Sequence, residues 1–282
     1  MNAEHRSLTE LADLGGRLAV VTGAARGFGA AIANRLAEAG ATVVIADVRL
    51  DDAAATAARI ADRTGARCVA ERLDVTDEAA VTAAFAGWRS EHGPVDILVN
   101  NAGVFSNHLA HEMPIAEFDR ILTINVRGAY LCSQAALRQM RAAGRGAIVN
   151  VASVDAYSTS AEGLTHYTTS KHAIAGMTRS LAVEAAPIGV RVNAVCPGAA
   201  MTEGAVELVT GGEATGIDVE AQWDGIVDRT PLGRLCDVDD VARAVTFLAS
   251  DLAAFVTGVL LPVDGGILIQ PLEGYVPHTE DA

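Results

Sequence analysis

Short apolar runs and longer amphipathic stretches alternate along this chain. A short apolar run bounded by glycine or polar residues is typical of a buried strand, whereas an apolar stripe every three to four residues is typical of a helix. The runs predict strands at residues 18–22, 42–46, 67–73, 95–100, 147–151, 190–195 and 258–263. The stretches between them predict a first helix that follows residues 23–29 and ends at about residue 40. Further helices are predicted at residues 51–64, 77–92, 115–143, 165–186 and 238–250. Because this alternation requires right-handed crossovers between parallel strands, we expect an α/β fold with a doubly wound parallel sheet of about seven strands and helices on both faces.

The alternation fills residues 16–269, which predicts one domain preceded by a polar extension (1–15) and followed by a tail (270–282). The pattern loosens over residues 199–231, where glycines stand among acidic residues. The segment is either a lid over the site or a poorly ordered surface insertion, and we treat it as a lid. Its apolar side chains suit an apolar ring or chain of a substrate, and its acidic residues disfavour a strongly anionic one.

The net charge and the apolar segments of the chain limit the kinds of partner that we expect. The formal net charge is −14, and such a field repels nucleic acid and anionic membrane surfaces. Residues 1–15 contain no long apolar run, and the apolar stretch at residues 252–263 is too short to span a bilayer. The four cysteines lack Cys-x-x-Cys spacing, which indicates reduced thiols. We therefore expect a cytoplasmic protein with no nucleic-acid or membrane partner.

A glycine-rich loop, Gly23-Ala24-Ala25-Arg26-Gly27-Phe28-Gly29, follows the first predicted strand and opens a helix. Glycines there permit positive φ and let backbone N–H groups approach a pyrophosphate. Asp47 ends the second strand, where a carboxylate accepts hydrogen bonds from the ribose hydroxyls of adenosine. These features predict a Rossmann-type dinucleotide site that takes NAD. Arg26 and Arg49 could instead bind the additional phosphate of NADP. We favour NAD because Asp47, and not an arginine, occupies the end of the strand.

The only lysine of the chain, Lys171, follows Tyr167 by four residues. On a helix these positions share a face, and an ammonium there favours the anionic form of the phenol and lowers its pKa. The pair predicts acid/base chemistry on an alcohol or a ketone. The alternative is that the chain has a general bias toward arginine over lysine, and that its single lysine stands at this position by chance.

Further motifs follow the other strands. They are Asn100-Asn101-Ala102-Gly103, then Asn125, then Ser153, and finally Pro197-Gly198-Ala199-Ala200-Met201-Thr202. Together with the glycine loop and the Tyr167/Lys171 pair, these motifs make the chain resemble the short-chain dehydrogenase/reductase family from about residue 16 to residue 266.

The resemblance implies a role for each motif residue. Tyr167 would be the general acid/base, Ser153 would polarise the carbonyl, and Asn125 would hold a water in a proton relay to Lys171. Asp74 and Val75 would flank the adenine, Lys171 would also bind the nicotinamide ribose, and Thr202 would lie near the nicotinamide. The expected cofactor contacts are Gly23, Arg26, Gly27, Phe28, Gly29, Asp47, Asp74, Val75, Asn101, Ala102, Gly103, Tyr167, Lys171, Pro197, Gly198 and Thr202. A homotetramer is also implied.

We therefore predict an NAD-dependent oxidoreductase that interconverts a secondary alcohol and a ketone, acting on a small molecule. Three alternatives remain: a non-catalytic dinucleotide sensor on the same scaffold, an NADP-dependent carbonyl reductase, and a sugar-nucleotide epimerase or dehydratase. The last expects a larger C-terminal domain than the roughly 85 residues after Gly198. No residue pattern identifies the alcohol or ketone.

Other residues carry weaker signals. Ser153 and Tyr167 are fourteen residues apart, one more than the family pattern, so the loop between them is extended, and its Asp155, Tyr157 and His166 are candidates for lining the pocket. Ala200 replaces the usual branched aliphatic residue beside the nicotinamide. His108, His111 and Glu112 are too few for a closed metal site, so we expect surface histidines and no metal. Cys196 has no paired base and is expected to be a packed thiol.

Overall fold

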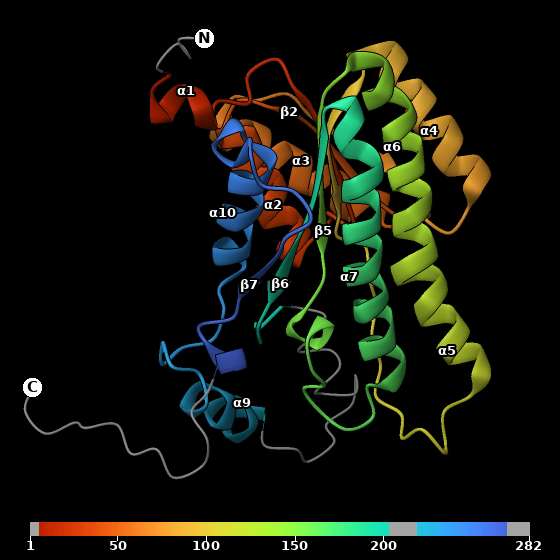
Figure 1. The fold of residues 1–282 in the computed structure, drawn as a ribbon, viewed down its shortest axis with the longest axis vertical. Coiled ribbons are helices and arrows are strands. Elements are labelled where there is room, and N and C mark those ends of the chain that lie inside the picture. Colours follow the sequence, from red (N-terminus) through yellow and green to blue (C-terminus); the bar gives the residue numbers. More distant parts are fainter. Residues whose placement is uncertain (1–5, 203–218, 270–282) are drawn as a thin grey trace, which may run out of the picture.

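All the strands of the computed structural model join one parallel sheet (Figure 1). The structure describes residues 6–202 and 219–269, so residues 203–218 of the predicted lid and the C-terminal tail lie outside the described residues. The seven strands follow the order β3-β2-β1-β4-β5-β6-β7. Their bounds are β1 (Leu18–Thr22), β2 (Thr42–Asp47), β3 (Cys68–Arg72), β4 (Val95–Asn100), β5 (Gly146–Val151), β6 (Val190–Pro197) and β7 (Leu260–Val263).

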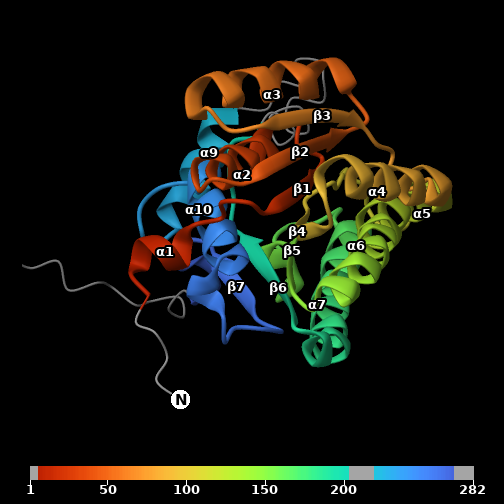
Figure 2. The same ribbon diagram turned by 90° about the horizontal axis from the view of Figure 1, so that it is seen from above.

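Helices cover both faces of this sheet (Figure 2). Their bounds are α1 (Leu8–Ala12), α2 (Gly27–Glu38), α3 (Leu50–Thr64), α4 (Glu78–His92), α5 (Ile115–Leu122), α6 (Ala129–Ala143), α7 (Thr165–Ala185), α9 (Val219–Asp228) and α10 (Val238–Ala249). One core cluster packs the sheet against α2, α3 and α10, and a second packs it against α4, α6 and α7. The predicted doubly wound α/β fold is confirmed.

Burial explains why the strands read as continuous apolar runs. Every residue of β1 and of β4 is buried, because helices cover both faces of the central strands. The edge strand β3 is only partly buried and carries Glu71 and Arg72. The sequence pattern therefore separates central strands from an edge strand.

The strand order reverses between β1 and β4. The chain runs from β1 outward to β2 and β3, and then returns to place β4 on the other side of β1. The loops that leave β1 and β4 therefore diverge at the carboxyl end of the sheet, which leaves a crevice there. The predicted motifs follow these strands, so the topology brings them to one edge.

The helix predicted at residues 115–143 is interrupted, and this prediction needs correction. A π-helical turn, Thr123–Gly128, separates α5 from α6. Such a turn accommodates one residue more than a regular helical turn and is frequent at functional sites. Asn125 lies within it and is buried, and Gly128 packs so closely on Val75 that a Cβ there would lie 2.6 Å from Val75 Cγ2.

Candidate active site

A cavity of about 870 Å³ opens at the carboxyl edge of the sheet. Of the predicted site residues, it is lined by Gly23, Arg26, Gly27, Phe28, Asp47, Asp74, Val75, Asn101, Ala102, Gly103, Ser153, Tyr167, Lys171, Pro197, Gly198 and Thr202. Two predicted residues, Gly29 and Asn125, lie behind its wall. The topology thus gathers residues that are far apart in the sequence into one space large enough for a dinucleotide and a small substrate.

The glycine loop forms a tight cradle at one end of the cavity. Gly23 and Gly27 have φ of +62° and +57°, which side chains other than glycine rarely adopt. A Cβ on Gly23 would lie 2.7 Å from Ala102 Cα, and one on Gly29 would lie 2.7 Å from Ala24 Cα. Gly29 therefore allows α2 to pack against the loop rather than contacting a ligand itself.

Thr22 and Asn101 join the loop after β1 to the loop after β4. Thr22 Oγ1 accepts hydrogen bonds from the backbone N–H groups of Asn101 and Ala102, both at 3.1 Å. The Asn101 side-chain amide donates to the carbonyl oxygens of Thr22 and Gly23, at 3.0 and 2.8 Å. The Asn101 side chain thus holds the glycine loop in shape. Thr22 directly precedes the glycines of the loop motif, but the sequence analysis gave it no role.

Asp47 presents a buried carboxylate at the end of β2, with 4% of its surface exposed. Its Oδ2 accepts from the backbone N–H of Ala25 in the glycine loop, and its Oδ1 accepts from that of Arg49, both at 3.0 Å. The Arg49 guanidinium lies 3.5 Å from Oδ1, so this arginine pairs with the carboxylate. Two backbone donors therefore fix the orientation of Asp47 toward the cavity.

Tyr167, Lys171 and Ser153 also line the cavity. Tyr167 and Lys171 lie on α7, with the Lys171 Nζ 5.4 Å from the centre of the Tyr167 ring. The ammonium donates a 2.9 Å hydrogen bond to the Val151 carbonyl at the end of β5. The Phe105 ring packs against the Tyr167 ring at a centroid distance of 5.6 Å. The sequence analysis did not single out Phe105, which lies just past Asn100-Asn101-Ala102-Gly103.

Burial dominates the acid/base properties of this pair. It raises the pKa of Tyr167 above its ordinary value of 10, and a hydrogen bond from Ser153 offsets only part of the rise. It also lowers the pKa of Lys171 to about 8. The sequence analysis expected the ammonium to lower the phenol pKa, but desolvation is the larger effect and the Lys171 Nζ binds the Val151 carbonyl.

The side chain of Asn125 is fully engaged within the protein. Its Oδ1 accepts from the Val104 N–H and its Nδ2 donates to the Val104 carbonyl, both at 2.8 Å. Nδ2 also donates to Ser170 Oγ at 3.0 Å. Asn125 thereby ties the π-helical turn to the loop after β4 and to α7. Ser170, which the sequence analysis passed over, completes this connection.

Asp155 organises the extended loop after β5. Ser153 Oγ donates to Asp155 Oδ2 at 3.1 Å and accepts from the Asp155 backbone N–H at the same distance. Ser160 and Thr168 also donate to this carboxylate. Neither Asp155 nor Tyr157 lines the cavity, and the Tyr157 hydroxyl donates to the Leu260 carbonyl. These two candidates therefore do not line this cavity, because the protein itself uses their polar groups.

The remaining candidates have other surroundings. His166 is buried beside Ser106 and outside the cavity wall, and His108 lies near it rather than with His111 and Glu112. Cys196 is a buried free thiol whose pKa burial raises to about 11, as expected of a packed thiol. The sequence analysis missed part of the wall. It includes Val48, Leu73, Thr76, Val104, Asp119, Arg120, Thr123, Ile124, Val151 and Ala152.

Comparison with known proteins agrees with this geometry. A family model described as enoyl-(acyl carrier protein) reductase matches residues 23–268. The chain is 46% identical to the cis-4-hydroxycyclohexanecarboxylate dehydrogenase of Sinomonas cyclohexanicum over 251 residues, covering 89% of this chain and 96% of the relative. The crystal structure of a short-chain type dehydrogenase/reductase from Mycobacterium marinum superposes with a TM-score of 0.85 at 36% identity, covering 93% of this chain and all of the other. The chain belongs to the short-chain dehydrogenase/reductase family.

Membership in the short-chain dehydrogenase/reductase family makes the protein an oxidoreductase whose relatives act on hydroxyl groups. The family binds a nicotinamide dinucleotide. A gluconate 5-dehydrogenase from Burkholderia cenocepacia was solved with NADP and tartrate, and it superposes with a TM-score of 0.84 at 34% identity over 93% of this chain and 99% of its own. In the described ranges, no helix combines the length and the apolar character that crossing a membrane requires.

Proposed function

We propose that this protein is an NAD-dependent dehydrogenase that interconverts a secondary alcohol and a ketone. The observation that carries the proposal is the meeting of Ser153, Tyr167 and Lys171 in the same cavity as the glycine cradle and Asp47. The cradle fits a dinucleotide, because Gly23 and Gly27 adopt positive φ in a loop that lines the cavity and leads into the first turn of α2, where backbone N–H groups can bind a pyrophosphate. A bound nicotinamide would accept or supply the hydride.

The residues of the chain would handle the proton and the substrate oxygen. Ser153 and Tyr167 present two hydroxyl groups to the cavity. The Ser153 hydroxyl, which donates to Asp155 in this structure, would turn its proton to the substrate oxygen, so that both hydroxyls stabilise the charge that develops there. Tyr167 would donate its proton during reduction and accept one during oxidation. Lys171 would hold a positive charge beside the phenol. The Asn125 side chain already hydrogen-bonds to Val104 and Ser170, so a water in the proton relay would bind to the Asn125 backbone.

The choice of NAD rests on Asp47. Its fixed carboxylate would accept hydrogen bonds from the adenosine ribose and would repel the additional phosphate of NADP. Arg49 already pairs with Asp47, which reduces its availability for that phosphate. The Burkholderia cenocepacia structure with NADP shows that the scaffold also takes that cofactor, so an NADP-dependent carbonyl reductase is the second candidate.

The substrate class can be tested with a panel of secondary alcohols and ketones. The 46% identical relative is named for a hydroxylated cyclohexanecarboxylate, which makes 4-hydroxycyclohexanecarboxylate and cyclohexanol the first pair to compare. The absorbance of the reduced nicotinamide reports turnover directly. Activity on at least one member supports the dehydrogenase, whereas tight dinucleotide binding without turnover of any member would favour the sensor. The presence of Asn125, Ser153, Tyr167 and Lys171 argues against the sensor.

The rate of oxidation should depend on pH more steeply than the rate of reduction. Because burial raises the pKa of Tyr167, the neutral phenol predominates through the neutral range and is ready to donate during reduction. Oxidation needs the phenolate, so its kcat/KM should rise from about pH 6 to about pH 9, whereas that of reduction should stay nearly level over this range. Initial rates in both directions across this range check the prediction. An oxidative rate that falls with pH would contradict it.

Replacing Lys171 by arginine should impair both turnover and NAD binding, with kcat falling at least about 10-fold. The buried ammonium fits between Val151 and the Tyr167 ring, whereas a guanidinium is planar, wider and charged at every accessible pH. Arg179→Lys, the reverse exchange farther along α7, is the control and should retain activity. Steady-state kinetics and NAD titration measure the effect. A fully active Lys171→Arg enzyme would remove the argument from the solitary lysine.

A further inference from the structure

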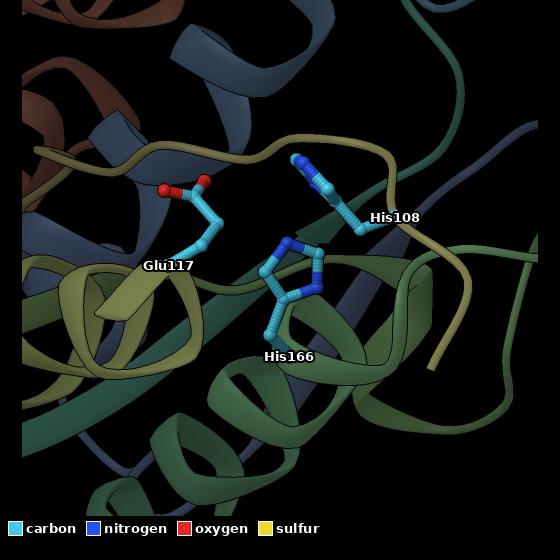
Figure 3. Close-up of side chains that lie close together, drawn as sticks. All are labelled: His108, Glu117 and His166. Carbon is cyan, nitrogen blue, oxygen red and sulfur yellow. The ribbon is translucent and has the colours of Figure 1, made fainter. Parts of the chain in front are cut away.

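His108, Glu117 and His166 form a side-chain cluster outside the cavity wall (Figure 3). One ligand atom from each residue lies within 4.8 Å of the other two. The residues come from the loop after β4, from α5 and from the start of α7, and Figure 3 shows the His166 ring pointing into the space between the other two side chains. Among the residues that the structure describes, this is the one group of three with metal-ligand chemistry at such distances.

The two imidazole rings lie within reach of the carboxylate. His166 is fully buried, and its Nε2 faces Ser106 and the other two side chains (Figure 3). The Nδ1 of His108 is buried and has no hydrogen-bond partner in the described part of the chain. A buried polar atom without a partner is costly, so the His108 ring has bonding capacity that a ligand could use. Neutral imidazole is a common ligand of transition metals.

The carboxylate of Glu117 is held in place by hydrogen bonds from Arg120 and Ser106. The Arg120 guanidinium donates to both of its oxygens at 2.7 Å, and Ser106 Oγ donates to Oε1 at 2.6 Å. Ser106 Oγ also lies 2.7 Å from His166 Nε2. A carboxylate and an imidazole therefore already converge on one small hydroxyl group.

We propose that His108, Glu117 and His166 bind one zinc ion, with the Ser106 hydroxyl or a water in the fourth position. Two nitrogen ligands and one oxygen ligand suit zinc, whereas magnesium and calcium prefer oxygen ligands alone. Bond lengths of about 2.0–2.2 Å place tetrahedral ligand atoms roughly 3.4 Å apart, so separations of up to 4.8 Å would have to close by up to about 1.4 Å. Rotation of the half-buried His108 side chain on its loop can supply that movement.

The ion would act as a structural cross-link and not in hydride transfer. It would join the loop that carries Phe105 to α5 and to the first turn of α7, where Phe105 packs against Tyr167. None of the three ligands lines the cavity, so the ion would contact neither cofactor nor substrate. The inference therefore stands independently of the proposed reaction.

The test is a titration of chelator-treated protein with zinc chloride, followed by calorimetry. We expect one equivalent to bind with a dissociation constant in the micromolar range or below, and the thermal unfolding midpoint to rise. His108→Ala and Glu117→Gln should each weaken this binding at least 10-fold. His111→Ala is the matched control, because His111 lies on the same loop but is exposed beside Glu112, and it should bind zinc normally. His166 is left unchanged because it is fully buried next to Tyr167.

Cobalt provides a second measurement that does not depend on affinity alone. Tetrahedral cobalt bound by two imidazoles and a carboxylate should give visible d–d bands that His108→Ala abolishes and His111→Ala retains. No binding at all, or zinc binding that both His108→Ala and Glu117→Gln retain, would overturn the site. Chelation should leave the rate of hydride transfer unchanged, so failure of the dehydrogenase proposal would not affect this result.

Discussion

Replacing Tyr167 by phenylalanine should lower kcat by about 10²–10⁴-fold, the usual contribution of a positioned general acid or base. The substitution keeps the ring, so the contact with Phe105 and the proximity to Lys171 remain. It removes the one group in the cavity that is placed beside Ser153 to exchange a proton with the substrate oxygen. NAD binding should change little. Steady-state rates together with NAD titration separate the two effects.

Tyr157 supplies the control for this experiment. Its hydroxyl donates to the Leu260 carbonyl and it lies outside the cavity wall, so Tyr157→Phe loses the same atom without touching the site. The Tyr157→Phe enzyme should retain its rate, with a loss of thermal stability at most. If Tyr167→Phe kept a tenth of the original rate, the proton would have to pass through another group.

Replacing Asp47 by serine should shift the preference from NAD toward NADP by about 10²-fold in kcat/KM. Hydrogen bonds to a charged acceptor contribute roughly 1.5–3 kcal/mol, and the carboxylate also repels the additional phosphate of NADP. Serine keeps a small polar group at the end of β2 and removes the ion pair of Asp47 with Arg49, which then has only Asp52, at 3.8 Å, as a described acidic partner. The ratio of kcat/KM for the two cofactors measures the shift.

Asp51→Ser is the matched control, since Asp51 is an exposed residue in the first turn of α3 and does not line the cavity. It should leave the cofactor ratio unchanged. Asp47 also accepts from the backbone of Ala25 and Arg49, so a thermal melt of Asp47→Ser is needed to show that the glycine loop is intact. A wild-type preference for NADP would mean that the arginines, rather than Asp47, define the pocket.

The sequence predicts the sheet well because its central strands are buried on both faces. β1 and β4 must be apolar throughout, and glycine or polar residues mark their ends. Most of the predicted site follows from the same logic, since residues after parallel strands meet at one edge. The π-helical turn does not follow, because Thr123–Gly128 differs in no local signal from the helices around it. Contacts of Asn125 with Val104 and Ser170, distant in sequence, accompany it.

The pKa shifts at Tyr167 and Lys171 and the histidine cluster could not be predicted from the sequence, because both depend on contacts between segments that are distant in the chain. A four-residue spacing places Lys171 near Tyr167 but says nothing about the Val151 carbonyl, which binds the ammonium, or about the burial that raises the phenol pKa. Glu117 and His166 lie on different helices and share no regular spacing with His108. Only the folded chain shows that these three residues are neighbours.

The π-helical turn serves the geometry of the site and is not needed to join α5 to α6. A regular helix could join α5 to α6 with one residue fewer, and the turn absorbs the additional residue without disturbing the packing on either side. A chain shortened by one residue there could therefore still fold, yet Asn125 would no longer face Val104 and Ser170. The additional residue of the π-helical turn therefore adapts the local backbone to the site, while the helices on either side remain regular.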